Sequence, residues 1–141
     1  MAIATRTLKD TAIASGSGAA GGKVTVLVNM NDNTTADSVV LDASGLAGHA
    51  NGAKLDITRI WWGLVQGTAD DNTGWASIIF EGDSDVTAIN LAGTGHYDGT
   101  AGKITNSATN AGATSGDINL SAYGVSGYIL IELRKDSSFT A

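Results

Sequence analysis

The stretch Gly127-Tyr-Ile-Leu-Ile-Glu-Leu-Arg134 decides the fold class, because large apolar residues occupy every second position along it. Successive side chains of a β-strand point to opposite faces of the sheet, so this alternation predicts a strand with one face in a core. The core-facing residues would be Ile129, Ile131 and Leu133. The opposite face would carry Tyr128, Leu130, Glu132 and Arg134.

Similar short runs recur between stretches of Gly, Ser, Thr, Asn and Asp, which favour turns and loops. These runs are Lys23–Met30, Ser38–Ala43, Lys54–Val65, Trp75–Phe80, Val86–Leu91 and Asp117–Leu120. Apolar residues nowhere recur at helical spacing for three turns. The sequence therefore predicts an all-β fold. We expect a two-sheet antiparallel sandwich of the jelly-roll type, with an immunoglobulin-like sandwich as the alternative.

Three local features refine this prediction. The apolar alternation of Lys54–Val65 changes phase near Thr58 and Arg59, which predicts a β-bulge there. Asn31–Thr35 is predicted to be a polar turn. Ala92–Gly116 is predicted to be a long loop, because few large apolar residues anchor it.

The chain divides into an N-terminal arm with its connector, residues 1–22, and a β-sandwich domain, residues 23–141. A length of 141 residues suits a single hydrophobic core. Met1–Lys9 alternates weakly and is interpreted as a short strand or an extended arm, and Gly16–Gly22 as a connector of small residues. We expect this arm to contact a neighbouring molecule.

Charge and composition disfavour several functions. The net charge is -6, the pI is near 4.5, and the eight basic residues are scattered singly, so no nucleic-acid partner is expected. The chain has no cysteine, which removes disulfides, thiolate nucleophiles and cysteine-bound metals. No apolar run approaches the roughly 20 residues of a membrane span, so no membrane partner is expected. We expect the chain to be synthesised as a soluble cytoplasmic product.

Two motifs are weak when their context is considered. Gly16-Ser-Gly-Ala-Ala-Gly21 matches a dinucleotide-binding pattern, but a predicted strand follows it where a helix is required, so we interpret it as a linker. His49 and His96 lie in separate Gly-rich segments without a third ligand nearby. No metal site and no cofactor are therefore predicted.

Acidic residues gather around one predicted turn: Glu81, Asp83 and Asp85, with Asp70 and Asp71 in the preceding loop. Paired carboxylates could serve glycoside hydrolysis or bind calcium, but the framework that each function requires is missing. We interpret these residues as solvated turn acids. No catalytic residue is predicted, and the chain is not expected to be an enzyme.

The adjacent Trp61 and Trp62 lie in a predicted strand, so their rings must face opposite sides. One ring is expected in the core, and the other at an intersubunit contact or on a sugar-stacking platform. Leu27 and Leu130 are also apolar on the faces opposite their strands' core sides. A homo-oligomer, most simply a trimer, is expected. The candidate interface residues are Ile3, Arg6, Leu8, Leu27, Trp61, Trp62 and Leu130.

The N-terminal arm, the Gly/Ala/Ser/Thr/Asn-rich β-domain without Cys or Pro, and the closing Tyr128–Lys135 resemble small virion proteins of tailed bacteriophages, particularly capsid decoration or cement proteins. The resemblance implies a jelly-roll-like protein, often trimeric, that lies on the capsid surface of the virion, binds the major capsid protein and stabilises the shell. The alternative function is a carbohydrate-binding module on a virion or cell surface, in which an exposed tryptophan stacks on a sugar.

Overall fold

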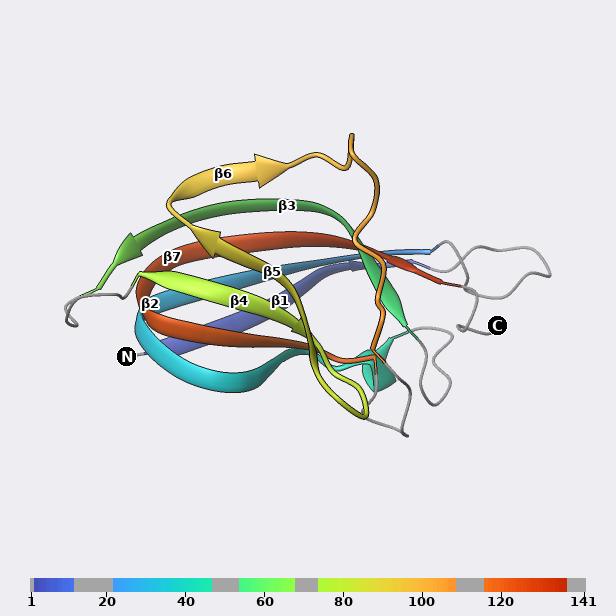
Figure 1. The fold of residues 1–141 in the computed structure, drawn as a ribbon, viewed down its shortest axis with the longest axis horizontal. Helices are drawn as coiled ribbons and strands as arrows, with labels where there is room; N and C mark the ends of the chain where they lie inside the picture. The colour runs from blue at the N-terminus through green and yellow to red at the C-terminus, as the bar shows by residue number, and fades with distance from the viewer. Residues whose placement is uncertain (1, 12–21, 47–53, 68–73, 109–115, 137–141) are drawn as a thin grey trace.

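A computed structural model describes residues 2–11, 22–46, 54–67, 74–108 and 116–136 (Figure 1). These residues confirm the predicted all-β class, and they contain one short 3-10 helix, Ala43–Gly45, but no α-helix. The strands are β1 (Ala2–Asp10), β2 (Lys23–Leu41), β3 (Leu55–Gln66), β4 (Trp75–Phe80), β5 (Val86–Ala92), β6 (Thr94–Tyr97) and β7 (Ile118–Lys135).

Hydrogen bonds join all seven strands in one antiparallel sheet. The main order is β1-β2-β7-β3-β6, while β4 pairs with β7 and β5 with β4. The two longest strands, β2 and β7, bend together at the same end of the molecule and so run through both parts of the sheet (Figure 1). The jelly-roll and two-sheet arrangements stay predictions, because the pairing is continuous.

The bend divides the sheet into two halves. The five-strand half contains β1, residues 23–30 of β2, residues 127–135 of β7, β3 and β6. The four-strand half contains residues 33–41 of β2, residues 118–125 of β7, β4 and β5. Buried side chains of both halves form one hydrophobic cluster, so the halves enclose a common core.

The alternation seen in the sequence places the core residues. Val24, Val26 and Val28 of β2 are buried in the five-strand half, as are the predicted inward residues of the last strand, Ile129, Ile131 and Leu133. The four-strand half contributes Ile78, Phe80 and Leu120, among others. The predicted β-bulge is confirmed, because the register of β3 against β7 shifts between Ile57 and Arg59.

Two predicted connections are wrong. Asn31–Thr35 is not a turn but a bulged part of β2, where the register against β7 shifts repeatedly and Asp32 adopts a positive φ of 46°. The predicted loop Ala92–Gly116 contains β6, which pairs with β3. Both segments are rich in polar residues, so their strand character is not visible in the sequence. Backbone pairing with a neighbouring strand supplies the stability that their side chains do not.

The run 121–126 also belongs to a strand, so the two predicted strands on either side of it form the single strand β7. Gly127 lies where β7 passes from one half to the other and has a φ of 130°. A Cβ at this position would lie 1.9 Å from the carbonyl oxygen of Gly63. Glycine is therefore required both for the backbone conformation and for the close approach of β3.

The N-terminal arm forms β1, which pairs with β2 of the same chain at the edge of the five-strand half. Its C-terminal end is held by Lys135, whose side chain is fully buried and whose Nζ donates to Asp10 Oδ1 and to the Thr11 carbonyl at 2.9 Å. A buried lysine is tolerated when a carboxylate and further hydrogen bonds compensate its charge. The arm is thus part of the sheet and supplies the compensating charge.

Candidate interaction surface

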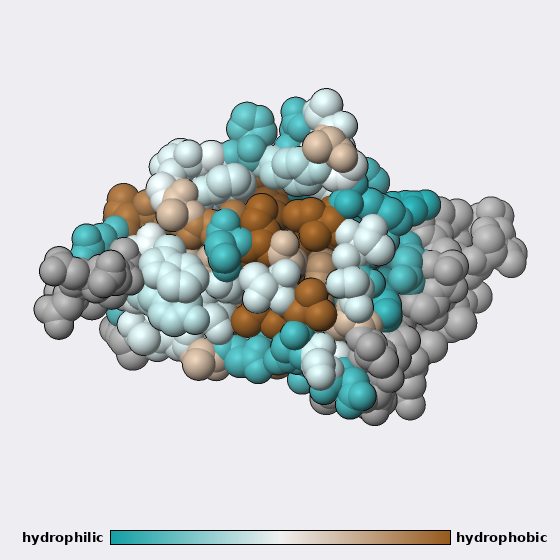
Figure 2. Space-filling view, in the orientation of Figure 1, coloured by the Kyte–Doolittle hydropathy of each residue, from teal (hydrophilic) through white to brown (hydrophobic). Residues whose placement is uncertain are grey.

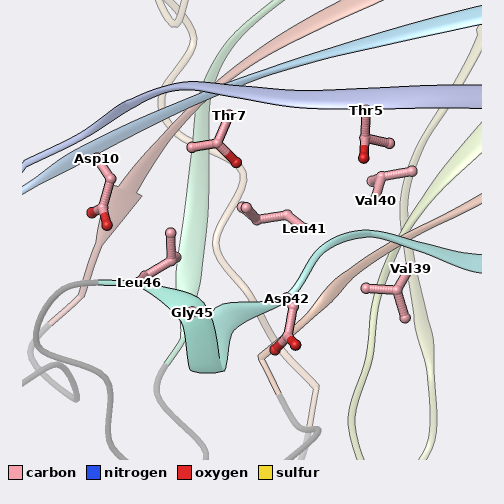
Figure 3. Close-up of a pocket in the computed structure, with 9 residues that line it drawn as sticks. All are labelled: Thr5, Thr7, Asp10, Val39, Val40, Leu41, Asp42, Gly45 and Leu46. Carbon is pink, nitrogen blue, oxygen red and sulfur yellow. The ribbon is translucent and has the colours of Figure 1, made fainter.

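The described residues that line the groove beside β1 form no catalytic arrangement (Figure 3). It has a volume of about 350 Å³ and lies between Thr5, Thr7 and Asp10 on one side and residues 39–46 on the other. The Thr5 and Thr7 hydroxyls have no histidine or lysine among the lining residues to activate them, and Asp10 is paired with Lys135. Nucleophilic catalysis needs such a base within hydrogen-bonding reach.

The other sequence candidates for chemistry do not converge either. His96 is exposed on β6, and within the described ranges no group of three His, Asp or Glu side chains could hold a metal ion. His49, Asp70, Asp71 and the glycine motif 16–21 lie outside the described residues.

The outer face of the five-strand half carries a row of directly paired residues, one from each strand. In the order of the sheet they are Arg6, Leu27, Leu130, Trp61 and His96. Residues paired directly across antiparallel strands point to the same side of the sheet. Leu27, Leu130 and Trp61 are half-buried, so this row forms a partly exposed apolar centre.

Tyr128 extends this apolar centre in the next row. Its side chain lies over Gly63, because a Cβ at Gly63 would be 2.8 Å from the Tyr128 ring. Tyr128 is nevertheless 40% exposed, and Leu8, at the register shift of β1, is 52% exposed. Tyr128 together with the half-buried Leu27, Leu130 and Trp61 gives this sheet face the aromatic and aliphatic character that is typical of an interaction surface.

Basic residues lie beside this apolar centre, toward the end of the face that holds Arg134 and at the β1 edge. The register places five of the eight lysines and arginines of the chain on the same face, all exposed: Arg6, Lys9, Lys23, Arg59 and Arg134. Glu132 lies among them, with Oε1 3.6 Å from Lys23 Nζ and 3.9 Å from Arg59 Nε. We call this surface, with Leu27, Leu130, Trp61 and Tyr128 at its centre, the basic-aromatic face.

The inference from sequence that the basic residues form no common face is therefore wrong. They are scattered along the chain, but strand pairing aligns them across β1, β2, β7 and β3. Because the chain as a whole carries a net charge of -6, the excess of negative charge lies on the rest of the molecule.

The outer face of the four-strand half has the opposite charge. Asn119, which is 2% exposed, donates from Nδ2 to Asp37 Oδ1 at 3.0 Å. Its partner across the strands is Ile79, two residues before Glu81. None of the eight lysines and arginines, all of which the structure describes, forms an ion pair with Asp37, Glu81, Asp83 or Asp85. We call this surface, Asp37, Glu81, Asp83 and Asp85 with Ile79, the acidic face.

Two carboxyl groups of this face, those of Glu81 and Asp85, have raised pKa values. Burial raises the pKa of Glu81 above 4.5, and the negative charges of Asp85 and Asp37 raise it further. Burial likewise raises the pKa of Asp85, with hydrogen bonding to Asp37 and the charge of Asp37 adding to the effect. Glu81 Oε2 and Asn119 Oδ1 are also buried without a hydrogen-bond partner. The acidic face thus carries negative charge that the described chain does not compensate.

Of the seven candidate interface residues, the structure brings four into one row: Arg6, Leu27, Leu130 and Trp61. Leu8 lies beside this row on β1. Ile3 and Trp62 instead pack against the core, and Trp62 Nε1 donates to the Ala92 carbonyl at 3.0 Å. The two adjacent tryptophans therefore face opposite sides, as predicted.

Sequence reasoning missed Tyr128 and every basic member of the face except Arg6. A signal for them was present, because Lys23 is in phase with Leu27, and Tyr128 and Arg134 are in phase with Leu130. What the sequence lacks is the register that aligns these strands with β1 and β3.

Other partly exposed apolar residues lie between the two halves. Trp62, Val86, Ala88, Ile89 and Ile104 pack against the core without being fully buried. Figure 2 shows apolar atoms gathered in the middle of the viewed face, with hydrophilic atoms around them. On the four-strand half, the rings of Trp75 and Tyr123 stack with centroids 4.1 Å apart.

No protein-family model, curated protein or solved structure matches this chain. None of the described residues forms a helix that is long and apolar enough to span a membrane. The surfaces themselves are therefore the basis for a functional proposal.

Proposed function

We propose that this chain is a non-enzymatic structural protein of a tailed-phage virion that binds the assembled capsid and stabilises the shell. The observation that carries the proposal is the basic-aromatic face, a broad sheet surface on which Trp61, Tyr128 and two leucines lie beside five exposed cations. Tryptophan, tyrosine and arginine are the residues that dominate protein–protein contacts. The resemblance to capsid decoration proteins supplies the kind of partner.

Stabilisation would follow from linkage alone. A protein that binds the assembled lattice, and not the free capsid subunit, shifts the equilibrium toward the shell by mass action. Several copies joined to one another would bind many lattice sites at once, which strengthens the effect without new contacts. No catalytic group is needed.

The test uses empty shells assembled from the major capsid protein of the phage that encodes the chain. Wild-type protein should sediment with these shells and raise their melting temperature, but it should not sediment with unassembled capsid protein. Shells that neither retain the protein nor gain stability would rule out the proposal.

The adjacent tryptophans provide a matched pair of variants. Trp61→Ala removes the centre of the basic-aromatic face and should weaken shell binding at least about tenfold, with little change in the melting temperature of the subunit. Trp62→Ala removes a ring packed against the core and should destabilise the subunit by about 3 kcal/mol. Shell pelleting and thermal unfolding separate the two effects, and equal behaviour of both variants in the two assays would contradict this assignment.

Carbohydrate binding is a second candidate, and the stacked Trp75 and Tyr123 favour it. Both rings are half-buried on the four-strand half, so part of their surface faces solvent where a sugar ring could stack. Binding to a polysaccharide panel that Trp75→Ala abolishes and Trp61→Ala preserves would support this candidate over shell binding.

A further inference from the structure

The geometry points to a head-to-tail contact between copies of this chain, in which the basic-aromatic face of one copy packs on the acidic face of the next. The contact does not depend on shell binding. It follows from two surfaces of one chain that carry opposite charge and that the described residues compensate only in part.

The two faces carry charges of opposite sign. Arg6, Lys9 and Arg134 lie on the basic-aromatic face, and among the described residues only Glu132 forms ion pairs with cations of that face. Asp56, the strand partner of Arg134, forms its ion pair with Lys103. The acidic face carries four carboxyl groups and no basic residue. Complementary potentials of this kind steer association and fix which surfaces meet.

Both faces also hold partly exposed apolar side chains. Leu27, Leu130, Trp61 and Tyr128 form a partly exposed centre on one face, and Ile79 is half-buried beside the carboxyl groups on the other. Sheet faces that pack on one another bury such side chains between layers, while the charged groups lie around them.

The symmetry of the contact between copies follows from these charges. A two-fold dimer through the basic-aromatic face would bring the five cations of both copies into one interface, which is electrostatically unfavourable. A head-to-tail contact instead joins unlike faces. Repeated, it produces a closed ring or an open stack, depending on the rotation between copies.

A single-stranded nucleic acid is the other polyanion with the chemistry to bind a face of cations and aromatic rings. The structure favours the protein partner. Glu132 lies within 3.9 Å of Lys23 Nζ and Arg59 Nε, so a carboxylate already occupies part of the face that phosphates would need. The remainder of the chain is acidic and would repel a long polyanion.

The experiment uses two variants of the full chain, each with one face reversed in charge. Arg6→Glu/Arg59→Glu alters the basic-aromatic face at exposed positions, and Asp83→Lys/Asp85→Lys alters the acidic face in an exposed turn. Sedimentation velocity at low salt measures their mass at micromolar concentration, and thermal unfolding confirms that both fold.

Wild-type protein should form multiples of the 14.2 kDa chain that dissociate as salt is added. Each variant alone should remain a monomer, with association weakened at least about tenfold. An equimolar mixture should associate again, because each variant retains one intact face and the two intact faces are complementary.

Two controls belong to the design. Arg59→Lys keeps the charge and should keep the association. Ala101→Glu adds a negative charge at an exposed turn residue that belongs to neither face, and it should also leave the association unchanged.

A wild-type monomer at all concentrations would overturn the inference. So would variants that associate like the wild type, or a mixture that remains monomeric. Monomeric wild type that binds oligothymidylate with salt-sensitive affinity would assign the basic-aromatic face to single-stranded nucleic acid instead. Shell binding by a strictly monomeric wild type would remove the head-to-tail contact but leave the proposed function standing.

Discussion

The charges at the two ends of β7 are compensated to different degrees. At the C-terminal end, Lys135 is fully buried, and Asp10 compensates its charge. At the N-terminal end, Asn119 contacts Asp37, near Glu81 and Asp85, and no lysine or arginine pairs with these three carboxyl groups. The first end fixes the arm to the sheet. The second end keeps a charge that a partner or a proton can neutralise.

The largest effect on the unfolding free energy should come from removing the carboxylate that pairs with Lys135. Asp10→Ala leaves Lys135 as a buried cation without its carboxylate, and this should cost roughly 3–5 kcal/mol of unfolding free energy. Denaturant unfolding measures the loss. Adding Lys135→Met to Asp10→Ala should recover much of it, because the unpaired charge is then gone. A single variant as stable as the wild type would show that the ion pair does not hold the arm.

A smaller effect of opposite sign on the unfolding free energy should come from the acidic face, at the N-terminal end of β7. Glu81→Gln removes a negative charge beside Asp85 and Asp37 and gives Asn119 Oδ1 a possible donor. The isolated subunit should gain about 0.5 kcal/mol of unfolding free energy at neutral pH. Thermal unfolding of the monomer measures this gain, and a loss of stability would contradict the interpretation.

The pH dependence of that gain follows from the raised pKa. The folded chain holds the proton of Glu81 more tightly than the unfolded chain does, so the stability from this group is present below the usual value of 4.5 and is lost as the pH rises through the folded value. The advantage of Glu81→Gln should therefore vanish in acid. A gain that is constant from acid to neutral pH would point to packing as its cause.

The smallest effect is expected at Asp83, which is exposed in the same turn. Asp83→Asn should change the unfolding free energy of the monomer by less than about 0.5 kcal/mol. A larger change in monomer stability would mean that the uncompensated charge extends over the whole turn.

The sequence predicted the elements better than their alignment. Alternation identified the inward residues of β2 and β7 and the bulge near Arg59, because a strand with one buried face needs a period of two. It missed β6, whose polar residues Thr94 and His96 are held by pairing with β3. It also could not join the two parts of β7, because Gly124 and Gly127 interrupt the apolar pattern where the strand bends.

The candidate surface shows the same limit. Parity along each strand was enough to place Leu27 and Leu130 away from the core and to put Trp61 and Trp62 on opposite faces, but it did not decide which ring lies outside. Register was needed to bring Arg6, from the N-terminal arm, into their row. Lys135 could not be predicted as a buried residue, because its partner Asp10 lies 125 residues away in the sequence.

In the head-to-tail contact, the cations of one copy neutralise the acidic face of another copy. The most direct measurement is the titration of the Glu81 carboxyl group by nuclear magnetic resonance, in associated wild type and in the monomeric Arg6→Glu/Arg59→Glu variant. The account predicts a pKa of Glu81 above 4.5 in the monomer and a lower pKa in the associated protein, because neighbouring cations favour the ionised form. A Glu81 pKa that is the same in both would contradict the head-to-tail contact.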